Sequence, residues 1–110
     1  MRVGICHCLA CQRRTGSIFG VQARFSRDRV SIAGQAREYV RVGDDGGRMT
    51  SRFCPECGST VYYTLDIEPD LVGVPVGAFA DPTFPAPSYS VYEARRHAWA
   101  RAPESVKHFE

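Results

Sequence analysis

The chain has 110 residues, which makes a single domain over residues 1–110 the default expectation. Its charged fraction of 24% and hydrophobic fraction of 44% are those of an ordinary globular protein, and its net charge of +2 is too small to favour nucleic acid as a partner. No apolar run approaches the ~20 residues that span a bilayer, and no signal peptide opens the chain. The sequence therefore predicts a cytoplasmic protein without a membrane partner.

The first feature along the chain is a cysteine cluster, "CHCLAC", which contains Cys6, Cys8 and Cys11. Residues two apart in a strand share a face, and a short helix expected over residues 9–15 would bring Cys11 back toward them. Clustered cysteines in a reducing compartment are typical of metal ligands rather than disulfides. Three thiolates without an obvious fourth ligand predict an open zinc site, which is the kind that catalysis needs.

Most of the remaining chain alternates apolar and polar residues with the period of two that is typical of strands. Turn-forming sequences such as "GDDGG" at residues 43–47 separate the runs. Pro75 within one run predicts an edge strand or a bulge. The pattern indicates a mainly β domain of about seven or eight short antiparallel strands, with both cysteine clusters at strand ends. The expected strands lie at residues 20–26, 37–43, 49–53, 59–66, 71–79 and 88–94.

The second cluster, "CPECG", contains Cys54 and Cys57 at the spacing of a metal knuckle, and Gly58 permits the positive φ of such a turn. Strands rather than a helix flank the pair, which argues against a redox dithiol. Two thiols are half of a closed zinc site. Alternatively, two thiols of the first cluster join Cys54 and Cys57 on a single ion, and the spacing alone leaves both arrangements open.

Four polar residues follow the third cysteine and are candidates for substrate binding: Arg13, Arg14, Thr15 and Ser17. The arginines could pair with a carboxylate, and the hydroxyls could bind a substrate hydroxyl. The alternatives are a solvated arginine face and ordinary capping. The histidines are weaker candidates. His7 is expected to point away from the thiols, and His97 and His108 are expected at the surface. We identify no general base.

Taken together, "CHCLACQRRTGSIFG", "RFCPECGS" and the late strand "SVYEARRHAWA" resemble the glutathione-dependent formaldehyde-activating enzyme family, which includes centromere protein V-like domains. The resemblance covers nearly the whole chain. It implies a Mss4-like β-tent, a catalytic zinc at Cys6, Cys8 and Cys11, and a structural zinc to which Cys54 and Cys57 give two ligands. The implied activity is that of a carbon–sulfur lyase, which condenses a small thiol such as glutathione with formaldehyde or a related aldehyde.

The chain departs from the family at its start, where members carry an earlier C-x-C pair that completes the structural zinc. Only residues 1–5 precede Cys6, so either the natural chain begins earlier or the knuckle finds other ligands. A missing strand would leave a sheet edge free to pair in a homodimer. A second function therefore stays open, that of a non-catalytic, zinc-stabilised binding module with the Mss4-like fold.

Overall fold

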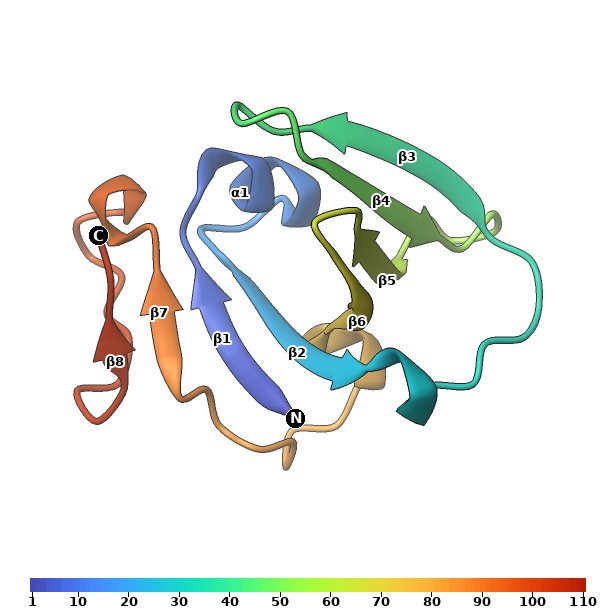
Figure 1. Ribbon diagram of the computed structural model, residues 1–110. Helices are drawn as coiled ribbons and strands as arrows, with labels where there is room; N and C mark the ends of the chain where they lie inside the picture. Colours follow the sequence, from blue (N-terminus) through green and yellow to red (C-terminus); the bar gives the residue numbers. More distant parts are fainter.

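The computed structural model describes all residues from 1 to 110 and contains one eight-stranded sheet, with strand order β3-β4-β5-β6-β2-β1-β7-β8 (Figure 1). The strands are β1 (Arg2–Cys6), β2 (Gly20–Ser26), β3 (Arg37–Val42), β4 (Arg48–Phe53), β5 (Thr60–Leu65), β6 (Glu68–Pro75), β7 (Tyr89–Val91) and β8 (Lys107–His108). The helices are α1 (Leu9–Thr15) and the 3-10 turns η1 (Arg27–Arg29), η2 (Val76–Phe79) and η3 (Glu93–Arg95). None is long and apolar enough to cross a bilayer. The predicted mainly β fold is confirmed.

The C-terminal part of the chain adds a parallel end to an otherwise antiparallel sheet. β7 pairs parallel with β1, and β8 pairs parallel with β7. Figure 1 shows β7 beside β1 and β8 on the far side of β7, with α1 at the end of β1 where the chain turns into β2. The sequence did not predict β8, because two residues are too few to show a period. This arrangement places residues 90 and 91 beside the end of β1 that carries Cys6, and His108 one strand further out.

Pro75 does not lie on an edge strand or at a bulge, so that prediction is wrong. β6 lies inside the sheet, between β5 and β2. Pro75 is the last residue of β6 and pairs with Gln22 of β2, whereas the pairing of β6 with β5 extends only to Gly73. Proline has no backbone N–H to donate, and here it has a strand partner on one side only. The missing donor is therefore tolerated in an interior strand.

Two tyrosine rings pack directly on glycines of neighbouring strands. A Cβ atom on Gly73 would lie 2.0 Å from Cζ of Tyr63, and one on Gly4 would lie 2.1 Å from Cζ of Tyr89. Both pairs face each other across a strand ladder. Burial raises the pKa of Tyr63, although the Arg24 guanidinium opposes that shift. Because side chains alternate along β1, the face of Gly4 is also the face of Cys6, so these rings pack the side of the sheet that carries the first cysteine.

We predict that Gly73→Ala destabilises the fold, because the added methyl group would overlap the Tyr63 ring. Overpacking of this kind costs about 1–3 kcal/mol in the free energy of unfolding, which urea denaturation can measure. Gly77→Ala is the matched control, since no atom lies within 4 Å of a Cβ at that position. Equal unfolding midpoints for the two variants would contradict the packing of Tyr63 on Gly73.

Candidate metal centre

Three thiols converge at the end of β1. The sulfur atoms of Cys6, Cys8 and Cys11 all lie within 4.8 Å of one another. They form the one group of three histidine, cysteine or acidic side chains close enough to share a metal ion. Cys6 and Cys8 are half-buried and Cys11 is buried. The set is all sulfur, which favours a soft or borderline cation such as zinc over magnesium or calcium.

The backbone between the thiols brings them together. Cys6 ends β1, Cys8 is the extended N-cap of α1, and Cys11 lies in the first helical turn. The Cys11 backbone N–H donates to the Cys8 sulfur at 3.3 Å, so one ligand caps the helix that carries another. The helix ends at Gly16, whose φ of 66° is left-handed and suits glycine. A strand end and a capped helix of seven residues therefore aim three sulfurs at one point.

The three thiols shift one another's pKa values. Hydrogen bonds with Cys11 and then Cys6 lower the pKa of Cys8 to about 2. Hydrogen bonds with Cys11 and then Cys8 raise the pKa of Cys6. The bond with Cys6 lowers the pKa of Cys11, but the bond with Cys8 and burial outweigh it, so the net shift is upward. One thiol of the cluster therefore loses its proton readily, whereas the other two keep theirs. A metal ion must displace these two protons before all three sulfurs can bind it.

Gly20 makes room for two polar side chains beside Cys11. Gln22 Nε2 donates to the Cys11 sulfur at 3.4 Å. A Cβ atom on Gly20 would lie 2.9 Å from Gln22 Nε2, 3.0 Å from Arg14 Nη2 and 3.4 Å from Cys11 Cβ. The missing side chain at Gly20 therefore lets an amide and a guanidinium approach the thiol. Sequence reasoning missed Gln22 and Gly20, since only the pairing of β1 with β2 places them there.

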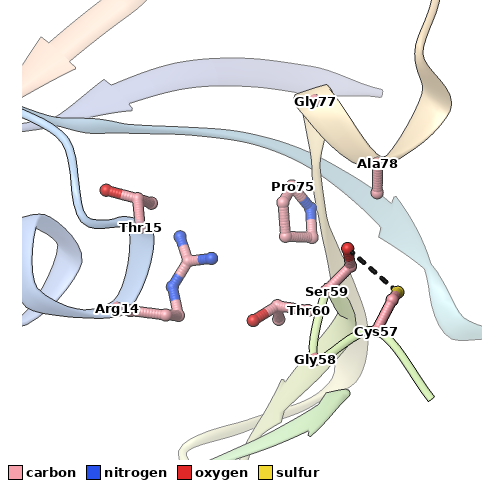
Figure 2. Close-up of a pocket in the computed structure, with 9 residues that line it drawn as sticks. All are labelled: Arg14, Thr15, Cys57, Gly58, Ser59, Thr60, Pro75, Gly77 and Ala78. Carbon is pink, nitrogen blue, oxygen red and sulfur yellow. Dashed lines mark hydrogen bonds between the residues drawn. The ribbon is translucent and has the colours of Figure 1, made fainter. Parts of the chain in front are cut away.

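The four polar residues after Cys11 divide into two groups. Arg14 and Thr15 line an open pocket of about 330 Å³, which Figure 2 shows facing the turn after Cys57. Arg13 and Ser17 are exposed and do not line it. The Thr15 hydroxyl donates to the Cys11 carbonyl at 2.9 Å and accepts the Ser17 N–H at 3.1 Å, so it helps to close the helix. Arg14 forms no comparable bond, and its Nε and Nη2 are buried without partners.

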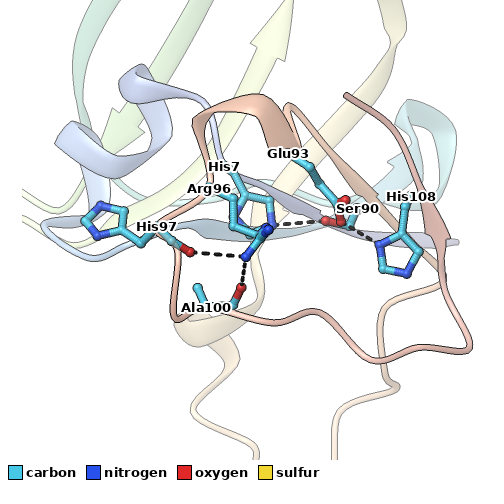
Figure 3. A network of polar contacts seen from close by, with 7 residues as sticks. All are labelled: His7, Ser90, Glu93, Arg96, His97, Ala100 and His108. Atoms are coloured by element: carbon cyan, nitrogen blue, oxygen red, sulfur yellow. Dashed lines mark hydrogen bonds and ion pairs between the residues drawn. The ribbon is translucent and has the colours of Figure 1, made fainter.

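His7 anchors the cysteine loop to the C-terminal part of the sheet. It is fully buried, and its Nε2 lies 3.0 Å from the Ser90 hydroxyl (Figure 3). Its backbone N–H donates to the Val91 carbonyl at 3.1 Å, and its ring meets Phe19 edge-on. Burial lowers the pKa of His7, which favours the neutral ring. His7 is not part of the thiol group, as the sequence predicted, but its structural role was not foreseen.

Gln12 ties the same loop to η3. Its Nε2 donates to the His7 carbonyl at 2.9 Å and to the Arg95 carbonyl at 3.1 Å. Its Oε1 lies 2.9 Å from His97 Nε2, and His97 itself is exposed. The ligand loop is thus crosslinked through one amide to a segment that follows β7. Gln12 was also missed, because its partners lie more than 80 residues away in the sequence.

His108 is exposed, as predicted, and its Nδ1 lies 2.6 Å from Glu93 Oε1 (Figure 3). This hydrogen bond lowers the pKa of Glu93. His97 and His108 therefore hold the C-terminal segment rather than belong to the thiol group.

Cys54 and Cys57 stay apart from the first cluster. They lie in the turn between β4 and β5, where Gly58 has the expected positive φ of 77°. Cys57 is exposed, and its sulfur is hydrogen-bonded to the Ser59 hydroxyl at 3.3 Å, which lowers the pKa of Cys57. The fold does not form the arrangement in which both clusters share one ion, because only the first three cysteines group together. Half of a second zinc site at Cys54 and Cys57 stays a prediction.

The fold and the cluster define a mainly β protein with a thiol group suited to a metal. The particular family follows from comparison with known proteins. A family model described as glutathione-dependent formaldehyde-activating enzyme matches residues 1–95, and the chain belongs to this family. The matched range contains both cysteine clusters together with Gly20 and Gln22. A comparison with curated proteins finds no match.

We predict that Gln22→Leu weakens zinc binding by roughly 10- to 100-fold, which is typical for loss of a hydrogen bond to a metal ligand. The leucine keeps the volume but removes the N–H that reaches the Cys11 sulfur. Competition with a chromophoric chelator measures the affinity. Gln35→Leu makes the same substitution at an exposed position and should bind zinc like the unmodified protein. Indistinguishable affinities for the two variants would show that Gln22 does not support the site.

Proposed function

We propose that this chain is a zinc-dependent enzyme that joins a small thiol, glutathione or a close relative, to formaldehyde or a related aldehyde. The supporting observation is the convergence of three cysteine sulfurs within 4.8 Å, in a chain that belongs to the formaldehyde-activating family. Three thiolate ligands leave one position of a tetrahedral zinc for another ligand. Zinc bound there supplies a Lewis acid that keeps a substrate thiol ionised at neutral pH.

The surroundings of the cluster suit a cation bound by thiolates. The buried Nε and Nη2 of Arg14 have no acceptor in the protein, and the gap over Gly20 places Nη2 near Cys11. Ionised cysteine sulfurs would supply the negative charge that this guanidinium lacks. Gln22 already donates to the Cys11 sulfur and would stabilise its ionised form. The donor set and the unpaired donors therefore fit a thiolate–zinc centre held by Cys6, Cys8 and Cys11.

The reaction is an addition without oxidation or reduction. The ionised sulfur of the substrate attacks the carbonyl carbon, and the π electrons of the C=O bond move onto oxygen. That oxygen then takes a proton from solvent, which replaces the proton that the thiol released, and the product is a hydroxymethyl thioether. The protein contributes binding and electrostatics, because the Arg14 guanidinium favours anions near the cluster. The ring of His7 is buried and lies against Ser90, so we do not propose it as a general base.

A second function is favoured by the small core. Only 15 of the 110 residues are buried, so a metal that ties β1 to α1 would contribute to stability whether or not catalysis occurs. In that case the chain is a zinc-stabilised binding module without turnover. The two functions share the ligands and differ in whether the open position accepts a substrate thiol.

We predict that Cys8→Ser lowers zinc affinity by more than about 100-fold and abolishes turnover, because Cys8 is both a ligand and the N-cap of the helix that carries Cys11. Exchange NMR on glutathione with formaldehyde measures the formation of S-(hydroxymethyl)glutathione, and metal analysis measures bound zinc. Ser31→Ala changes an exposed residue that belongs to neither cysteine cluster nor to the pocket lining, and it should retain both properties. Turnover that persists in Cys8→Ser would refute the zinc mechanism, and zinc binding without any turnover in the unmodified protein would favour the binding module.

A further inference from the structure

We propose that the pocket beside the thiol cluster binds a carboxylate of the thiol substrate, with Arg14 as the cation that receives it. This inference rests on the proposed function, because the thiol of the same substrate would occupy the cluster. The pocket has a volume of about 330 Å³ and lies between the end of α1, the turn after Cys57 and the start of η2. Figure 2 shows the guanidinium of Arg14 projecting toward Pro75, with Ser59 and Thr60 on the opposite wall.

The charge of the lining selects an anion. Of the nine lining residues, Arg14 is the only cation and none is Asp or Glu, while Cys57 contributes a thiol. The side chains of Thr15, Ser59 and Thr60 add hydroxyl groups that can donate hydrogen bonds. A cation with hydroxyl donors and no competing carboxylate is the composition expected of an anion site. A carboxylate suits such a site, because it accepts charge-assisted hydrogen bonds from a guanidinium and further hydrogen bonds from hydroxyl groups.

Arg14 has unused hydrogen-bonding capacity. Its side chain takes part in none of the hydrogen bonds or ion pairs of the structure, although salt bridges are formed by Arg24 and Arg52. Its Nε and Nη2 are buried, and a buried charged donor without an acceptor is costly. Because Nη2 lies over Gly20 beside Cys11 and Nε is buried with it, Nη1 is the guanidinium nitrogen that an anion in the pocket can reach. This arrangement is typical of a binding group that is organised before its ligand arrives.

The same side chain joins the pocket to the cluster. The Cβ position over Gly20 lies 3.0 Å from Arg14 Nη2 and 3.4 Å from Cys11 Cβ, so the guanidinium stands next to a predicted zinc ligand. A substrate that carries both a thiol and a carboxylate could therefore place its sulfur at the cluster and its carboxylate near Arg14. Glutathione carries a carboxylate on each side of its thiol, with a peptide unit between. A thiol without a carboxylate could use the cluster but not the pocket.

S-methylglutathione distinguishes the two sites. Its methylated sulfur cannot ionise, but both of its carboxylates are intact. We expect it to bind the zinc-loaded protein and to move the backbone NMR signals of Gly58, Ser59 and Thr60. Arg14→Gln should weaken this binding by about 10- to 100-fold, the usual loss for a charge-assisted hydrogen bond. Arg13→Gln is the matched control, since Arg13 is exposed and does not line the pocket, and it should bind normally. The diethyl ester of S-methylglutathione should bind the unmodified protein as weakly as S-methylglutathione binds Arg14→Gln.

Equal binding of S-methylglutathione to Arg14→Gln and Arg13→Gln would overturn the proposal, as would equal binding of the diester and the diacid. Displacement of S-methylglutathione by an equal concentration of inorganic phosphate would overturn the assignment to carboxylate. Zinc content and circular dichroism of Arg14→Gln establish that the cluster and fold persist. Failure of the proposed function looks different: the unmodified protein would not turn over glutathione and formaldehyde, yet S-methylglutathione would still bind in an Arg14-dependent way.

Discussion

The convergence of three sulfur atoms is the constraint on which the rest of the site depends. Like-charged thiolates repel one another, so they stay together only if the backbone holds them and a cation offsets their charge. The chain meets the first condition with a strand end, an extended N-cap and one helical turn, over the six residues from Cys6 to Cys11. Gly20 has no side chain, and this leaves room beside Cys11 for the side chains of Gln22 and Arg14.

Support for this local loop comes from distant parts of the chain. His7 reaches Ser90, and Gln12 reaches Arg95 and His97, each across more than 80 residues of sequence. The parallel pairing of β1 with β7 brings these partners together. A buried, hydrogen-bonded anchor between two ligands limits their movement, which lowers the entropy cost of closing them around an ion. The C-terminal segment thus supports the candidate metal centre, although it supplies none of the three thiols.

The sequence predicted what depends on local pattern. The helix at residues 9–15 has the predicted bounds, because it follows from short-range pattern and from the cysteine spacing. The alternating runs became strands in part: the strand expected over 71–79 ends at Pro75 and continues as η2, and the one expected over 88–94 is limited to Tyr89–Val91. The prediction of an edge strand or a bulge at Pro75 was wrong because strand order is set by long-range pairing, which the sequence of a single strand does not reveal. Gln22 and Gly20 were missed for the same reason. The sequence position after Cys11 was enough to make Arg14 a candidate. To tell that Arg14 and not Arg13 lines the pocket, however, one must know in which direction each side chain leaves α1.

Cobalt(II) substitution tests the central claim, that the three cysteines form a centre with one position open to a substrate thiol. Sulfur-to-cobalt charge-transfer absorption increases with the number of thiolate ligands, and tetrahedral cobalt has its own visible bands. With three cysteine ligands and one open position, the cobalt-loaded protein should show a spectrum of three thiolates that gains charge-transfer intensity when glutathione is added and does not change with S-methylglutathione. A spectrum that already shows four thiolates, or one that glutathione leaves unchanged, would contradict the account.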